Sequence, residues 1–75
     1  MEEQIHIGQI IQEELKRQGK TVTWLSQQLN ISRTECYRIF HRKSTDTQTL
    51  YCISVLLGRD FFEEYTKYLT EMGVE

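Results

Sequence analysis

The sequence predicts an all-α protein built from five short helices. Apolar residues recur at spacings of three and four along most of the chain, which is the period of a helix with one buried face. No segment shows the sustained alternation of apolar and polar residues that a half-buried strand needs. The 75 residues include no proline, so the four glycines are the main signals for helix ends. This length and an ordinary globular composition predict one domain, spanning 1–75, with a small core.

The first two predicted helices are each defined by one apolar face. The first covers about residues 5–17 and stacks on one side Ile7, Ile11 and Leu15. Gly19 is placed to end it. The second covers about residues 22–29, has Thr21 or Thr23 as its N-cap, and carries on one face Val22, Leu25 and Leu29.

The third predicted helix has the sharpest start signal in the chain. Asn30 suits the left-handed residue that ends the preceding helix. Ser32 and Glu35 have the spacing of a capping box, in which each side chain accepts a hydrogen bond from the other residue's amide. The helix continues to about His41. It is expected to bury Cys36, Ile39 and Phe40, and to expose Arg33, Thr34, Tyr37, Arg38 and His41.

The last two predicted helices also begin at acidic caps. The fourth starts after Asp46, ends at Gly58, and buries Leu50, Ile53 and Leu57. The fifth is expected to open at Asp60, because Asp60 and Glu63 have the spacing of a cap and its third helical residue. It would then contain Phe61, Phe62, Tyr65, Tyr68 and Leu69.

Charge is unevenly distributed along the chain. The net charge is −2, but residues 1–15 carry four glutamates and no lysine or arginine. Residues 16–43 have a net charge of +6, and residues 44–75 have a net charge of −4. The basic side chains of the central segment are Lys16, Arg17, Lys20, Arg33, Arg38, Arg42 and Lys43. Such a segment is either a set of solvated helix faces or a surface that meets phosphate.

A short helix, a tight turn and a capped second helix are predicted at about 22–41, with LSQQLNIS at 25–32 followed by RTECYRI at 33–39. This stretch resembles the lambda-repressor-like, or Xre/Cro-type, family of transcriptional regulators, whose commonest form reads Leu-Ala-x-x-Leu-Gly-Ile-Ser at this place. The likeness extends from about Ile7 to Phe62. It implies a compact five-helix DNA-binding domain with a helix-turn-helix at about 22–41.

The resemblance implies sequence-specific binding of double-stranded DNA by a small transcriptional regulator, which we expect to be a repressor. The helix that opens near Ser32 would enter the major groove. The base contacts are expected from side chains that point outward near the start of this helix, which are Arg33, Thr34 and Arg38. Contacts to the DNA backbone are assigned to Ser32, Tyr37, Arg42, Lys43, Ser44 and Thr45.

Other functions are less well supported by the sequence. An enzyme is not expected, because no catalytic triad, Cys-His pair or Gly-rich phosphate loop is present. Cys36, Cys52, His6 and His41 lack the spacing of a zinc site, and no cofactor is indicated. Two unpaired cysteines indicate a cytoplasmic protein, and no apolar run approaches the ~20 residues of a membrane span. The alternative function is a protein-interaction module, such as an adaptor or antitoxin-like subunit, with the same fold.

A symmetric homodimer is expected, with the fifth helix supplying much of the contact. Its heptad-type seam consists of Phe61, Tyr65, Tyr68 and Met72. Phe62 and Leu69 lie to one side and are expected to join the monomer's own core. A two-fold axis would let two recognition helices read half-sites about one helical turn apart. The alternative is that all these aromatic residues pack onto the first and fourth helices.

Overall fold

The computed structural model describes residues 5–73, which form five helices and contain no strand. The helices are α1 (Ile7–Arg17), α2 (Val22–Leu29), α3 (Arg33–His41), α4 (Thr47–Leu57) and α5 (Glu63–Glu71). The all-α prediction is therefore confirmed. None of these helices is long and apolar enough to cross a membrane.

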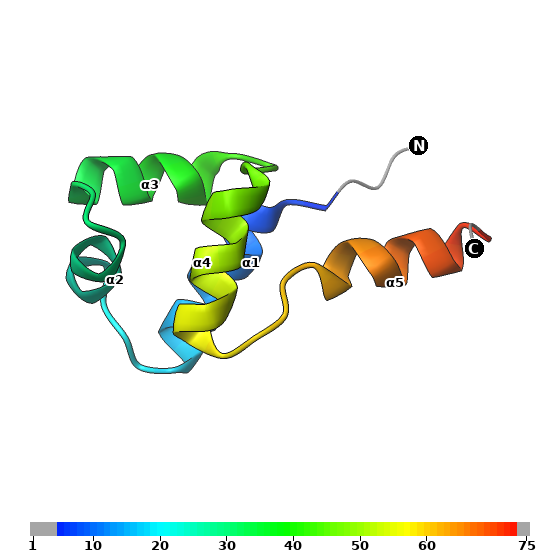
Figure 1. Ribbon diagram of the computed structural model, residues 1–75, viewed down its shortest axis with the longest axis horizontal. Helices are drawn as coiled ribbons and strands as arrows, with labels where there is room; N and C mark the ends of the chain where they lie inside the picture. Colours follow the sequence, from blue (N-terminus) through cyan, green and yellow to red (C-terminus); the bar gives the residue numbers. More distant parts are fainter. Residues whose placement is uncertain (1–4, 74–75) are drawn as a thin grey trace.

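The first four helices form a body from which α5 projects to one side (Figure 1). Within the body, α3 packs against both α1 and α2, and α4 packs against α2. The molecule is elongated, with extents of 39 × 22 × 22 Å. Figure 1 shows why: α3 and α5 lie toward opposite ends of the long axis, and α4 lies between them.

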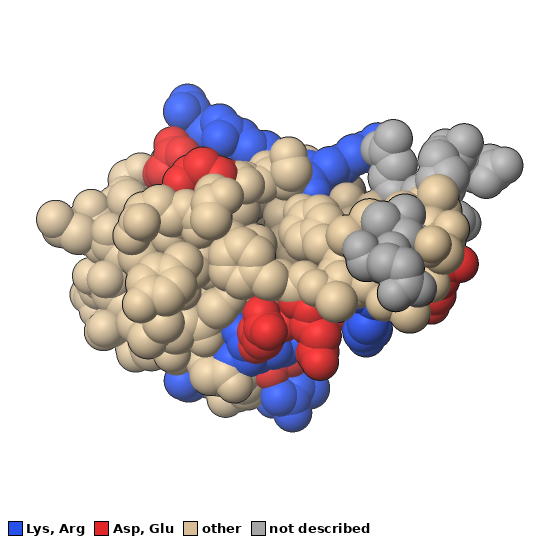
Figure 2. Space-filling model, turned by 45° about the vertical axis from the view of Figure 1, so that its right-hand side comes forward, with Lys and Arg blue, Asp and Glu red and all other residues tan. Residues whose placement is uncertain are grey.

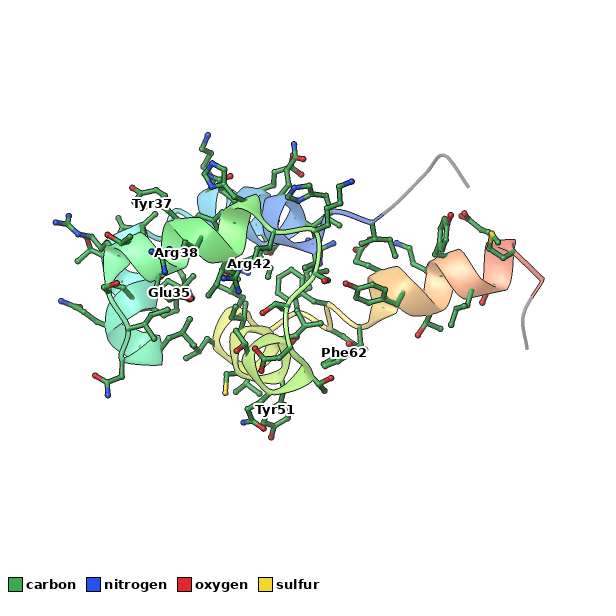
Figure 3. The ribbon with its side chains drawn as sticks, turned by 90° about the horizontal axis from the view of Figure 1, so that it is seen from above. Glu35, Tyr37, Arg38, Arg42, Tyr51 and Phe62 are labelled. Carbon is green, nitrogen blue, oxygen red and sulfur yellow. The ribbon has the colours of Figure 1, made fainter. Side chains whose placement is uncertain are left out.

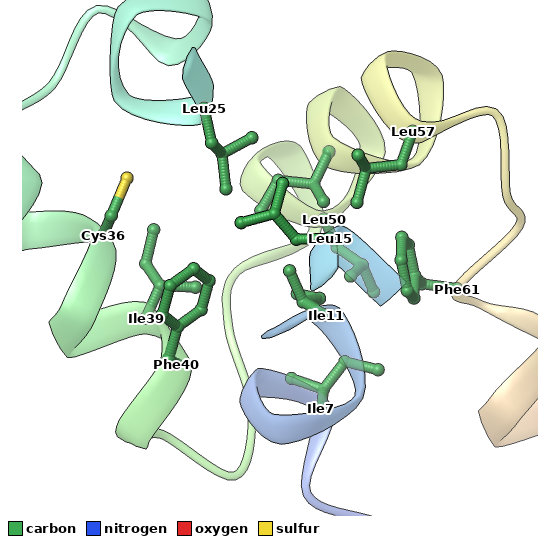
Figure 4. Close-up of a cluster of buried hydrophobic side chains, with 11 residues drawn as sticks. Ile7, Ile11, Leu15, Leu25, Cys36, Ile39, Phe40, Leu50, Leu57 and Phe61 are labelled. Carbon is green, nitrogen blue, oxygen red and sulfur yellow. The ribbon is translucent and has the colours of Figure 1, made fainter. Parts of the chain in front are cut away.

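The core is formed by one face from each helix of the body together with one residue from the segment before α5 (Figure 4). Its buried apolar side chains are Ile7, Ile11, Leu15, Leu25, Cys36, Ile39, Phe40, Leu50, Ile53, Leu57 and Phe61. Full burial of an aliphatic or aromatic side chain contributes about 1.5–3 kcal/mol relative to exposure, so this cluster dominates the stability of the fold. The predicted buried residues of α1, α3 and α4 are confirmed, whereas Val22 and Leu29 of α2 are only partly buried at its edge.

Local side-chain and backbone signals set most of the helix ends as predicted. In three N-caps a side-chain oxygen accepts a hydrogen bond from the amide three residues later: Thr21 from Trp24 at 3.0 Å, Ser32 from Glu35 at 3.1 Å and Asp46 from Thr49 at 3.0 Å. Asn30 and Gly58 follow α2 and α4 with positive φ angles of 59° and 64°, the left-handed conformation expected there.

One helix cap was not predicted, and one prediction about a helix start is wrong. His6, for which no role was predicted, is the N-cap of α1, where its Nδ1 accepts a hydrogen bond from the Gln9 amide at 3.1 Å. The fifth helix begins at Glu63, later than expected. The Asp60 carboxylate instead accepts from the Phe62 amide two residues later, at 3.0 Å, and so forms a turn ahead of the helix.

The late start of α5 changes the roles of its apolar residues. Phe61 has an exposed fraction of 0% and fills the core of the body, so its predicted place in an exposed dimer seam is wrong. Leu69 was expected in the monomer's core, but it is 48% exposed, so this prediction is also wrong. The physical reason is that Phe61 lies before the helix, and a heptad count through it does not describe one helix face.

Candidate nucleic-acid interface

The outward face of α3 is polar and largely exposed. Its four most N-terminal outward side chains all lie in contact with solvent: Arg33, Thr34, Tyr37 and Arg38. The opposite side of the helix packs on α1 and α2. The predicted division of α3 into buried and exposed positions is thus confirmed for every residue assigned to it, including exposed His41.

The start of α3 is held by half of the predicted capping box. The Ser32 hydroxyl accepts from the Glu35 amide, and its own proton remains available to donate. The reciprocal bond to the Glu35 carboxylate does not occur among the described residues; that carboxylate lies 3.5 Å from the Arg38 guanidinium. Because this ion pair is exposed and long, it contributes little stability.

The exposed residues of α3 divide into two sides (Figure 3). Glu35, Arg38 and Arg42 lie on the side toward α4, and Tyr37 lies on the other side. The Tyr37 ring meets the Phe40 ring edge-on, with centroids 6.1 Å apart. The ring therefore packs against Phe40 on one edge while Tyr37 stays 48% exposed.

The turn after α3 carries the remaining predicted contact residues. Arg42, Lys43 and Ser44 are exposed. Thr45 is only partly exposed and, together with Arg42, lines a shallow hollow between α3 and α4. The turn therefore presents two basic side chains and one hydroxyl to solvent, with a second hydroxyl set back from the surface.

The backbone of this turn is attached to the start of α1. The Ile7 amide donates to the Lys43 carbonyl at 2.9 Å, and the Gly8 amide donates to the Arg42 carbonyl at 3.0 Å. A Cβ atom at Gly8 would lie only 2.2–2.5 Å from three carbonyl oxygens at the end of α3, so only glycine permits this approach. From the sequence, the glycines were expected only to mark helix ends, so this contact was not predicted.

A second feature that the sequence did not reveal is the buried carboxylate of Glu14. It accepts hydrogen bonds from Arg17, from Gln18 at 2.7 Å and from Arg59 at 2.8 Å. These hydrogen bonds lower the pKa of Glu14 to about 2, and the bond from Arg17 has the largest effect. Arg59 also donates to Glu64 at 2.6 Å and so links α1 to α5. The only sequence signal was the position of Glu14 beside the apolar stripe of α1.

Two basic residues of the central segment, residues 16–43, interact with other side chains of the body. Arg17 is paired with Glu14, and the Lys20 ammonium lies 4.5 Å from the centroid of the Trp24 ring. Both side chains therefore have partners within the body. Four other basic residues of this segment belong to α3 and the turn after it and are exposed, namely Arg33, Arg38, Arg42 and Lys43.

Within residues 5–73, no group of three or more His, Cys, Asp or Glu side chains is arranged to hold a metal ion. Comparison with family models, with curated proteins and with solved structures gives no match to this chain. The chemistry of the α3 surface is therefore the main indication of function.

Proposed function

We propose that the chain binds double-stranded DNA sequence-specifically, as a small transcriptional regulator in the cytoplasm, with repression as its expected effect. The main support is that four exposed basic residues lie on α3 and the turn after it, namely Arg33, Arg38, Arg42 and Lys43. Glu35 is the sole acidic residue between 33 and 45, and it pairs with Arg38. The family resemblance of residues 25–39 supports the same proposal.

In this proposal α2 and α3 act as a helix-turn-helix, and α3 enters the major groove. Arg33 and Arg38 are long enough to donate two hydrogen bonds to the O6 and N7 atoms of guanine. Thr34 offers its methyl group to thymine and its hydroxyl to a base edge. These three residues are the proposed source of sequence preference.

The turn after α3 supplies the proposed contacts to phosphate, which come from Arg42, Lys43, Ser44 and the less exposed Thr45. Ser32 and Tyr37 would contact the backbone from α3 itself. The hydrogen bonds from α1 hold the turn in one conformation before binding. A held turn favours affinity, because less conformational entropy is lost when the contacts form.

The regulator is proposed to work as a homodimer, because one helix covers few base pairs and a two-fold axis doubles the contacts. On α5 and at its C-cap the proposed contacts are Tyr65, Tyr68 and Met72. Tyr65 and Tyr68 are half-buried, and Met72 is 51% exposed.

The test is fluorescence anisotropy with duplex DNA selected from a randomised pool, at low and moderate salt. Arg42→Ala and Lys43→Ala should weaken all sequences alike and reduce the salt slope by about one each. Arg33→Ala and Arg38→Ala should relax base preference at a cost of about 1–3 kcal/mol. Lys67→Ala, which removes an exposed lysine from α5, is the matched control and should leave binding unchanged.

The proposal is wrong if all four alanine variants keep the affinity of the unmodified chain at low salt. If the unmodified chain itself shifts no duplex at low salt, the result favours the alternative, a protein-interaction module with the same fold.

A further inference from the structure

The outer face of α4 carries an exposed apolar ridge. Tyr51 and Val55 lie one turn apart on this helix, on the side away from the core, and are 57% and 64% exposed. We call this pair the α4 ridge. The residues that α4 contributes to the core are Leu50, Ile53 and Leu57. Folding of one chain therefore does not require two large apolar side chains on the outer face of this helix.

A shallow groove runs along each side of the α4 ridge. The groove toward α2 is lined entirely by uncharged residues, which are Gln28, Leu29, Tyr51, Cys52, Val55 and Leu56. The groove toward α5 includes Ser54, Gly58 and Phe62, and it is also lined by charged Arg59 and Asp60. Figure 2 shows a broad uncharged area on this side of the molecule, with the charged side chains at its upper and lower borders.

We infer that the α4 ridge is the centre of the surface that binds a second copy of this chain; the need for two copies rests on the proposed function. A ridge with a groove beside it is self-complementary, because a two-fold axis places the ridge of each copy in the groove of the other. The ridge and the groove toward α2 carry no charged side chain, which suits this occupant, since identical patches that carry charge would oppose like charges across the axis.

The area that a stable dimer needs also points to α4. Such an interface buries about 800 Å² on each partner and engages about 20–30 residues a side. The nine residues of α5 cannot supply this area alone, and two of its three proposed contact residues are already half-buried. The α4 ridge and its grooves supply additional apolar surface, while α5 extends the contact on one side.

This placement leaves the DNA-binding face uncovered. In Figure 3 the exposed face of α3 is turned toward the viewer, whereas Tyr51 points sideways from α4. A two-fold axis along that viewing direction, passing beside Tyr51, keeps both copies of α3 on the same side of the dimer. Both helices can then approach one duplex.

The experiment is sedimentation equilibrium of the full chain without DNA, at tens of micromolar. The unmodified chain should be a dimer. Val55→Glu and Tyr51→Glu should each be monomeric with an unchanged circular dichroism spectrum, because both positions are exposed in the monomer. Val55→Thr, which keeps the shape and adds no charge, should remain dimeric. An equimolar mixture of Val55→Glu and Val55→Lys should recover the dimer, because a residue near a two-fold axis faces its own copy.

Two outcomes overturn the inference: an unmodified chain that is monomeric, or glutamate variants that both remain dimeric. Failure of the proposed function is recognised separately, on DNA. Val55→Glu should keep its affinity for a single half-site and lose the gain from a second half-site, whereas Arg38→Ala should stay dimeric and lose affinity for both duplexes. A dimer that depends on the α4 ridge but binds no duplex would refute DNA binding and leave the inference standing.

Discussion

The body formed by α1–α4 and the projecting α5 are stabilised in different ways. Every helix of the body fully buries residues in the common core, whereas α5 fully buries none along Glu63–Glu71 and packs against the core only through partly buried Tyr65. An isolated helix of this length is marginal in water. Helix α5 is therefore positioned mainly by the segment that precedes it, and most of its own surface is available to other contacts.

That preceding segment holds α5 through two residues, Arg59 and Phe61. Phe61 inserts its ring into the core, and the Arg59 guanidinium lies 5.1 Å from the centroid of that ring. Arg59 also bridges Glu14 of α1 and Glu64 of α5. The five predictions below test this division, beginning with the largest expected effect.

The anchor between the two regions should be the most sensitive position. Phe61→Ala removes a fully buried ring, and truncations of this kind cost about 3–5 kcal/mol of unfolding free energy. Urea denaturation followed by circular dichroism measures this cost. A loss as small as that of an exposed α5 variant would show that the ring does not join the core of the body.

Within the body, the closest backbone approach should be the next most sensitive. Gly8→Ala places a methyl group against the carbonyl oxygens at the end of α3, and overpacking typically costs about 1–3 kcal/mol. The control is Gly73→Ala: nothing lies within 4 Å of the added carbon, although the positive φ at this position also strains alanine. Equal losses at both positions would mean that α1 does not contact α3 as described.

The start of α3 is a local feature of the body and should matter less. Ser32→Ala removes the acceptor for the Glu35 amide at 3.1 Å and should cost about 1 kcal/mol. Thermal or urea unfolding gives the value, and Ser32→Asp, which restores an acceptor, should recover it. An unchanged midpoint for Ser32→Ala would place the start of the helix elsewhere.

The polar link between the body and α5 should respond to pH. The pKa of Glu14 is lowered from 4.5 to about 2, so its contribution to stability is present above pH 4.5 and is lost as the pH falls toward 2. Arg17, its first partner, is 71% exposed, so water screens the pair and we rank this effect below the preceding three. Urea midpoints at a series of pH values should fall less steeply for Glu14→Gln than for the unmodified chain.

The outer surface of α5 should show the smallest effect on folding. Leu69→Ala changes an exposed side chain and should alter the unfolding free energy of the monomer by no more than about 0.5 kcal/mol. The measurement is made at low protein concentration, where association does not contribute. A loss comparable with that of Phe61→Ala would show that Leu69 packs onto the body in the folded monomer.

The sequence determined the helices of the body because their signals are local. Thr21, Ser32 and Asp46 act on amides three residues away, and Asn30 and Gly58 act through their own backbone conformation. The apolar spacing within each helix likewise identified the buried faces of α1, α3 and α4. The assignment of α3 to DNA, by contrast, remains a prediction from residue chemistry and family resemblance.

Tertiary structure alone decided the features that depend on residues far apart in the chain. The spacing of aromatic residues after Asp60 fitted a continuous helix, yet Phe61 enters the core because an apolar space between α1 and α4 accepts its ring. Gly8 is required by carbonyl groups more than thirty residues away, and Glu14 is buried because Arg59 reaches it from the segment before α5. Periodicity and caps report on a helix and its nearest turns, whereas these contacts arise only when separate helices pack together.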